Sequence, residues 1–180
     1  MRVLASALLS LLVLGMFAAC SGNETADDPK LSDQGKEVVK AVGGPFTADE
    51  FRKFLDDLPK IPGLTKSAQG ASDASGAAMN TAVRNAIKDQ GWDEDRFLYI
   101  YSHAMTMVNL DQMQRMTDQM QAQFKDMPDD QRKAMEQMLS KQIGGQLNDV
   151  QADVDKQVPA SEQAIVRDNM DKLMRVMGIR

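Results

Sequence analysis

Methionine is the residue type in this chain with the most unusual potential for chemistry. The 180 residues include fourteen methionines, eight of which lie between Met105 and Met138. Three pairs have the spacing i, i+3: Met113/Met116, Met135/Met138 and Met174/Met177. Thioether sulfur is a soft ligand that suits Cu(I), and this spacing places two sulfurs on one face of a helix. A soft-metal site is therefore one interpretation.

Two other interpretations explain the same methionines. Because the pairs coincide with predicted apolar helix stripes, methionine is favoured as a flexible core residue in a chain short of leucine and isoleucine. A surface rich in methionine and glutamine can also repack against a partner. For partner binding or soft-metal binding, the candidate residues are Met113, Met116, Met120, Met135 and Met138.

Acid–base and nucleophilic chemistry have little support in the sequence. His103 is the only histidine, so a histidine metal cage or an HExxH pair cannot form. The GxSxG, GxxxxGK[ST] and strand-linked GxGxxG patterns are missing too. The carboxylate groups sit at predicted helix ends, where a solvated cap is the favoured interpretation: Asp56-Asp57, Asp93 to Asp95 and Asp129-Asp130. We therefore predict no catalytic residues, no metal site, no cofactor and no enzymatic activity.

The only cysteine, Cys20, ends an apolar run at the beginning of the chain. Arg2 is followed by a run of apolar or small residues from Val3 to Ala19, which is short for a membrane-spanning helix. A positive start, an apolar core and small residues at the end are typical of a signal peptide. Residues 1–19 are therefore predicted to be removed.

The segment Phe17-Ala18-Ala19-Cys20 resembles the lipobox of bacterial lipoproteins, in which leucine is usual at the position of Phe17. The resemblance implies cleavage before Cys20, a diacylglycerol on its sulfur and an acyl chain on its new amino group. Two or more chains anchor a protein stably to a membrane. In the sorting pattern of enterobacterial lipoproteins, Ser21 favours the outer membrane, so the domain is expected to face the periplasm.

The rest of the chain is predicted to be a short tether and one domain. Without residues 1–19 the chain has 20 Lys and Arg against 26 Asp and Glu, a formal charge of −6. An acidic domain is a poor fit to nucleic acid or to an anionic membrane surface. Residues 20–30 are polar after Cys20 and are predicted to be a flexible linker, whereas residues 31–180 can form a single domain with a core.

Helix signals dominate residues 31–180. Thr47 and Glu50 match a capping box inside a Phe46/Phe51 hydrophobic staple, and Pro59 and Pro62 end the helix that follows. An alanine-rich helix is expected over residues 71–91, closed by Gly91. Asp93 is predicted to cap the next helix, with Trp92 packing on Phe97.

The second half of the domain is predicted to contain a long antiparallel hairpin. Its first arm covers residues 93–124 with a bend near 109–111, and its turn lies around residues 126–128. The second arm is expected to kink at Gly144-Gly145 and to end at Pro159. Ser161 is predicted to cap a last helix that Gly178 closes. The expected fold is all-α, with four to five helices.

The segment from Met127 to Arg132, followed by Met135 and Met138, resembles part of the Spy/CpxP-type periplasmic proteins. Pro128 and Gln131 match a Leu-Thr-Pro-Glu-Gln segment of that family, and the likeness covers about a dozen residues. It implies an all-helical stress or chaperone protein. The predicted function is a lipid-anchored envelope protein that binds or scaffolds an envelope protein partner through a helix face. The alternative is a chaperone-like or copper-binding stress protein, and the oligomeric state stays open.

Overall fold

A computed structural model describes residues 28–65, 76–124, 127–139 and 143–179. These residues form eight α-helices and one 3-10 helix, without a β-strand among them, so the all-α class is confirmed. The helices outnumber the predicted four to five because the helix over residues 33–41 was not predicted and because two predicted helices each correspond to two observed ones. Their order is α1 (Asp33–Ala41), α2 (Ala48–Asp57), η1 (Leu58–Lys60), α4 (Gly76–Asp89), α5 (Glu94–Gln123), α6 (Asp129–Leu139), α7 (Gly145–Gln157), α8 (Ala160–Asp168) and α9 (Met170–Met177).

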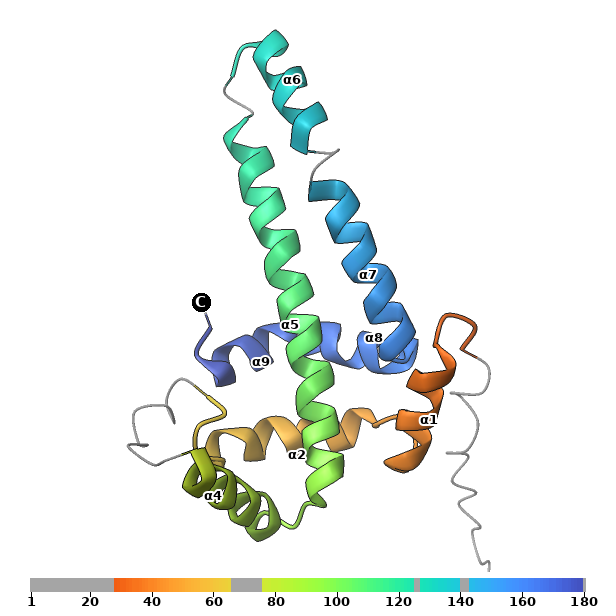
Figure 1. Cartoon of the computed structure of the whole chain (residues 1–180). Helices are drawn as coiled ribbons and strands as arrows, with labels where there is room; N and C mark the ends of the chain where they lie inside the picture. The colour runs from red at the N-terminus through yellow and green to blue at the C-terminus, as the bar shows by residue number, and fades with distance from the viewer. Residues whose placement is uncertain (1–27, 66–75, 125–126, 140–142, 180) are drawn as a thin grey trace, which may run out of the picture.

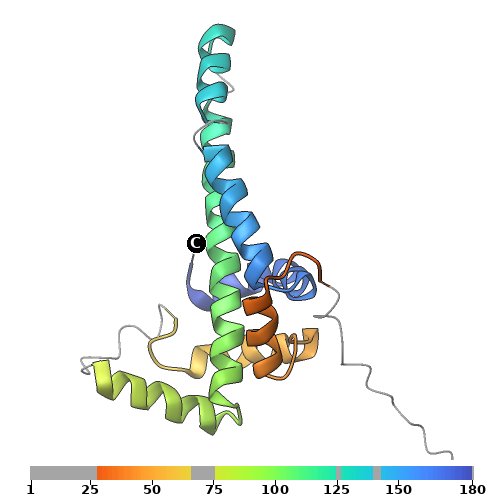
Figure 2. The ribbon, with the colours of Figure 1, turned by 45° about the vertical axis from the view of Figure 1, so that its right-hand side comes forward.

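The molecule has a helical base from which a long hairpin projects (Figure 1). The base consists of α1, α2, α4, α8, α9 and the first half of α5. The second half of α5 continues out of the base, and α6 and α7 return beside it in the opposite direction. The view in Figure 2, turned by 45°, shows that the projecting part is a single thin layer. From here on, "the hairpin" means α5 from Asn109 onward, α6 and α7.

Two helices, α2 and α5, begin as their local sequences predict. The Thr47 hydroxyl accepts from Glu50 N, and the Glu50 side chain accepts from Thr47 N, which completes the capping box. The Phe46 and Phe51 rings stack with their centroids 5.4 Å apart. Asp93 caps α5 by accepting from Arg96 N at 3.0 Å. The core of the base contains Phe46, Phe51, Phe54, Phe97 and other buried apolar side chains.

The hairpin helices differ in part from the predictions. α5 is one continuous α-helix of 30 residues, so the predicted bend near residues 109–111 is wrong. The kink predicted at Gly144-Gly145 stays a prediction. Ile143 and Gly144 form a π-helical turn directly before α7, and π turns are a common cause of kinks.

The start of α8 was predicted incorrectly. The helix begins at Ala160, so Ser161 lies inside it, and its buried hydroxyl oxygen has no hydrogen-bond partner in the structure. Asp28 serves as the cap instead, since its carboxylate accepts from Ala160 N at 2.9 Å. The predicted last helix is divided into α8 and α9 at Asn169. Gly178 closes α9 with a φ of 69°, as expected of a left-handed helix end.

Residues 28–32 form a strap across the junction of α7 and α8. Lys30 pairs with Asp155 at 2.9 Å, and both the backbone N–H and the hydroxyl of Ser32 donate to the carbonyl of Lys156. The last three residues of the predicted linker, 28–30, therefore contact the folded domain. The predicted signal peptide and Cys20 lie outside the described residues.

Candidate functional site

The two arms of the hairpin meet along one apolar seam. On α5 the seam follows a spacing of three and four residues, typical of a coiled coil, through Leu110, Met113, Thr117, Met120 and Phe124. On the returning arm it includes Met135, Ile143, Leu147, Val150 and Val154. A layer of two helices cannot enclose its own seam, and most of these side chains are accordingly only half-buried.

The five candidate methionines fall into two groups. Met113, Met120 and Met135 are half-buried in the seam, whereas Met116 and Met138 are 62% and 54% exposed. The core interpretation is therefore wrong for Met116 and Met138, whereas Met177 is buried and Met174 packs against the core, as that interpretation predicts. Met107 and Met170 are also buried. Between Met113 and Met120 the seam contains the half-buried Thr117, whereas Met116 is exposed.

The outward side of α5 carries a stripe without a single charge. The stripe consists of five exposed residues at intervals of three and four, and we call it the amide stripe: Asn109, Gln112, Met116, Gln119 and Gln123. At 100° per residue its centre lies roughly a quarter turn from the seam. Exposed helix faces usually carry charge, and depletion of charge together with methionine is typical of protein interfaces.

Charged residues on the same part of α5 lie elsewhere around the helix. Asp111, Arg115 and Asp118 lie about 80–140° from the centre of the amide stripe, and Arg115 is a helical neighbour of Gln112 and Gln119 at its edge. Arg115 bonds to Asp111 at 2.6 Å and lies 3.8 Å from Asp171 of α9. The amide stripe is thus a feature of one face and does not reflect a general lack of charge on the helix.

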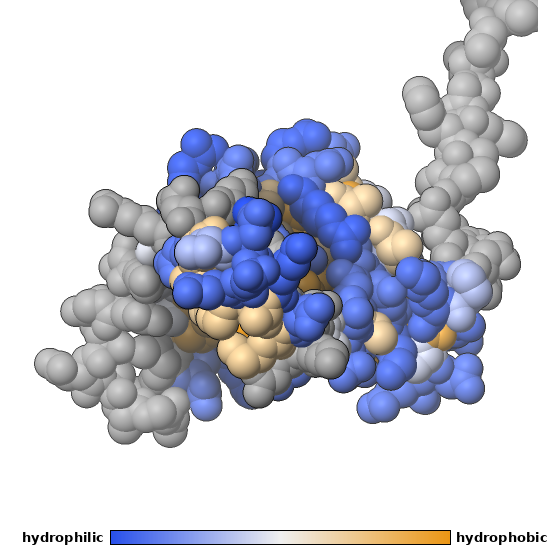
Figure 3. All heavy atoms as spheres, turned by 90° about the horizontal axis from the view of Figure 1, so that it is seen from above, coloured by the Kyte–Doolittle hydropathy of each residue, from blue (hydrophilic) through white to orange (hydrophobic). Residues whose placement is uncertain are grey.

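A shorter uncharged lane occurs on α6. Gln131, Ala134 and Met138 are exposed and repeat the spacing of three and four residues. Met116 and Met138 are two of the four large hydrophobic side chains that are exposed in the described residues. Figure 3, which views the molecule from above, shows hydrophobic patches between the hydrophilic side chains on this side.

This geometry divides each methionine pair of the hairpin. Met113 and Met116 are about 60° apart around α5, with the first in the seam and the second in solvent. Met135 and Met138 are divided in the same way on α6. The spacing alone had indicated a shared face, whereas the burial pattern gives the two members of each pair different surroundings.

His103 belongs to a buried polar network that the sequence did not reveal. Its Nδ1 lies 2.6 Å from a carboxylate oxygen of Glu162, which has no exposed surface. The other Glu162 oxygen accepts from the Tyr99 hydroxyl at 2.7 Å and from Phe46 N at 2.9 Å. Since 59 residues separate His103 from Glu162, no local pattern links them. His103 is thus a buried residue of α5 that is paired with Glu162.

The network joins α5, α8 and the segment before α2. The pKa of Tyr99 is raised far above its ordinary value, mainly by burial and secondly by the negative charge of Glu162. Tyr99 therefore remains a hydrogen-bond donor at physiological pH. Through these contacts the network contributes to the packing of the base.

Asp57 corrects the prediction that the carboxylate groups are solvated caps. Its side chain is 10% exposed and accepts from Lys53 and Lys60, each at 2.7 Å, and from the Trp92 ring N–H at 2.9 Å. Burial by itself would raise the pKa of Asp57, but these three donors outweigh it and lower the pKa to about 2. Asp57 thus holds the end of α2 against the start of α5.

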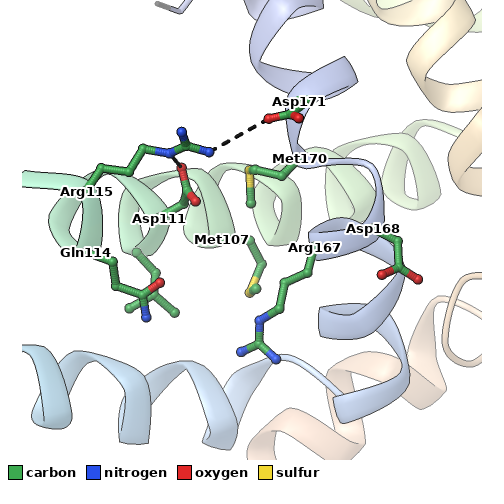
Figure 4. Close-up of a pocket in the computed structure, with 9 residues that line it drawn as sticks. Met107, Asp111, Gln114, Arg115, Arg167, Asp168, Met170 and Asp171 are labelled. Carbon is green, nitrogen blue, oxygen red and sulfur yellow. Dashed lines mark hydrogen bonds and ion pairs between the residues drawn. The ribbon is translucent and has the colours of Figure 1, made fainter. Parts of the chain in front are cut away.

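A pocket of about 300 Å³ lies at the foot of the hairpin, between α5 and the α8–α9 junction (Figure 4). Its buried apolar lining comes from Met107, Leu110 and Met170. Arg115 and Arg167 lie at its edge together with three aspartates, so both signs of charge are present. This mixture favours no single ligand class, and the amide stripe is the better candidate site.

The described residues contain no cluster of three or more His, Cys, Asp or Glu side chains suited to a metal ion. None of their helices has the length and apolar character needed to cross a membrane. Comparison with protein-family models, curated proteins and solved structures found no match to this chain.

Proposed function

We propose that this protein is a lipid-anchored component of a bacterial cell envelope that binds or scaffolds a protein partner through its hairpin and catalyses no reaction. The observation that carries the proposal is the amide stripe, an exposed and uncharged helix face on a projecting element. Its Met116 offers apolar contact area, and its amide side chains can hydrogen-bond to a partner without the cost of removing a charge from water.

The anchor in this proposal is Cys20, on the strength of its lipobox-like surroundings. Eight residue steps separate Cys20 from Asp28, where the strap begins. An extended chain covers at most about 3.6 Å per residue, so the strap stays within roughly 30 Å of the lipid. The hairpin is fixed to the strap through Asp155 and Lys156. The domain would thus be held close to the membrane, and Ser21 favours the outer membrane, with the domain in the periplasm.

A chaperone-like role is the second candidate, and the exposure of Met116 and Met138 favours it. Flexible, exposed methionine side chains can adapt to many unfolded chains. This role uses the same surface but predicts many weakly held clients in place of one partner. The copper-binding form of the alternative has less support, because each hairpin methionine pair is divided between seam and solvent.

The test is a cross-linking capture with the full-length lipidated protein in its own membranes. Met116→Glu places a charge in the middle of the amide stripe, whereas Gln121→Glu places the same charge on an exposed position of the opposite side of α5. We expect Met116→Glu to lose the cross-linked partner and Gln121→Glu to keep it, with mass spectrometry as the readout. Equal capture by the two variants would contradict a binding role of the stripe.

A further inference from the structure

The methionines of the hairpin differ in how easily an oxidant in solution can reach their sulfur atoms. Met116 and Met138 are 62% and 54% exposed, whereas Met113, Met120 and Met135 are half-buried in the seam. An oxidant has to touch the sulfur, so conversion to methionine sulfoxide is expected first at the two exposed positions. Each methionine pair of the hairpin therefore combines one accessible sulfur with one that is partly shielded.

The surroundings of Met116 differ from those of Met138. Gln112 lies four residues before Met116 and Gln119 three residues after it, and both are exposed on the same stripe. Side chains at these spacings are neighbours on a helix, and each glutamine amide carries N–H donors. A sulfoxide oxygen at Met116 can therefore accept hydrogen bonds from the flanking amides. Met138 has Ala134 four residues before it and gains no such donor there.

We infer that Met116 is a site of reversible oxidation by hypohalous acids, and that its sulfoxide releases the partner of the amide stripe. The inference rests on the proposed function, because it adds a means of regulation to the same face. Met116 is the only apolar residue of the amide stripe. Oxidation replaces this apolar contact by a polar group that has to lose its hydration when a partner covers it, which weakens binding.

The modification is a two-electron oxidation, with hypochlorous acid as the representative oxidant. The sulfur of Met116 forms a bond to oxygen and loses two electrons, the chlorine is reduced to chloride, and one proton is released. In the return reaction two thiol groups of a methionine sulfoxide reductase become a disulfide, and the oxygen leaves as water. Because the sulfoxide sulfur is chiral, complete reversal needs two reductases, one for each epimer.

Oxidation of the purified full-length lipidated protein tests the site itself. The protein is treated with a limiting amount of hypochlorite, and peptide mass spectrometry measures the sulfoxide formed at each methionine. We expect Met116 to be modified at least about fivefold faster than Met113 and Met120, because its sulfur is more exposed. Equal rates at Met113 and Met116 would contradict the assignment of the site.

Capture by the oxidised protein tests the regulation. After removal of hypochlorite the protein is added to membranes from cells that lack it and is cross-linked there, so the partner is never oxidised. We expect capture to fall by at least about tenfold, because the apolar contact is lost, and to return after treatment with both reductases.

Two leucine variants supply the matched controls. Met116→Leu keeps the apolar area but has no sulfur, so it is expected to capture the partner equally before and after oxidation. Met138→Leu removes the other exposed sulfur, and we expect it to lose capture on oxidation as the parent chain does. Circular dichroism of both variants checks that their helix content is unchanged.

The outcomes separate this inference from the proposed function. The inference is overturned if the oxidised parent chain or oxidised Met138→Leu keeps its capture, or if oxidised Met116→Leu loses it. In that case the proposed function still stands when Met116→Glu loses the partner and Gln121→Glu keeps it. If the untreated parent chain captures no partner, or if these two glutamate variants capture it equally, both fail.

Discussion

At the scale of single residues, the two buried carboxylates of the described residues differ in how far along the chain their partners lie. Asp57 has its lysine partners three and four residues away, so its ion pairs are local. Glu162 has partners on α5 and before α2, and all of them are distant in sequence. Both carboxylates are surrounded by donors, because an ionised group in the interior is stable only when its oxygens are bonded.

Asp57 gives the protein a defined acid sensitivity. Its pKa is about 2 in the folded protein and about 3.9 in an unfolded chain, so its stabilising effect is complete above about pH 4 and is lost as the pH falls towards 2. We expect Asp57→Asn to lower the free energy of unfolding at pH 7 by about 1–2 kcal/mol and to flatten its decline below pH 4. Urea unfolding followed by circular dichroism at pH 7 and pH 3 measures both effects.

The control for this prediction is the neighbouring residue. Asp56 pairs with Lys172 at 2.8 Å, but its side chain is 63% exposed. Asp56→Asn is therefore expected to change the free energy of unfolding by no more than about 0.5 kcal/mol. A similar loss in the two variants would show that burial of Asp57 is not the cause.

At the scale of elements, the hairpin depends on how closely α1 and α7 approach. Gly35 of α1 is buried, and a Cβ at this position would lie 2.5 Å from the carbonyl oxygen of Lys156. The close approach lets Ser32 donate to the same carbonyl at the end of α7. Gly145, the first residue of α7, has open space around it instead. A side chain at position 35 would therefore collide with α7, whereas a side chain at position 145 would have room.

Alanine substitutions distinguish these two glycines. Gly35→Ala is expected to lower the free energy of unfolding by about 1–3 kcal/mol, because the backbone of α1 must move away from α7. Gly145→Ala is expected to raise it by about 0.4–1 kcal/mol, because alanine restricts the unfolded chain and meets no obstacle. Thermal unfolding of the two variants beside the parent chain tests the pair, and destabilisation by both would contradict the assignment.

At the scale of the whole molecule, the strap lies between the predicted anchor at Cys20 and the hairpin. Asp28 caps α8, Lys30 pairs with Asp155, and Ser32 bonds to Lys156. The first described residues of the chain therefore lie at the junction of α7 and α8. These contacts fix residues 28–32 against the end of α7 and the start of α8.

Removing the strap contacts should loosen this junction. In Asp28→Ala with Lys30→Ala we expect faster amide hydrogen exchange at the end of α7 and the start of α8, because the cap and the ion pair are both lost. The matched control is Glu37→Ala with Lys40→Ala, which removes one acid and one base from exposed positions of α1. Equal exchange in the two double variants would mean that the strap does not hold the junction.

The amino-acid sequence was sufficient to predict the class of this fold and several of its helix starts and ends. The capping box at Thr47, the cap at Asp93 and the left-handed end at Gly178 depend on contacts within a few residues, which a local pattern contains. The signal peptide and the lipid on Cys20 remain predictions from the same kind of pattern.

Only the tertiary structure decided which apolar positions are enclosed and which face of the hairpin is free. Met113 and Met116 have the same residue type and neighbouring positions, yet one faces the returning arm and the other faces solvent. The partners of Glu162 and the role of Asp28 as the cap of α8 likewise join distant parts of the chain. Burial depends on what packs against a helix, and periodicity along one helix does not contain that information.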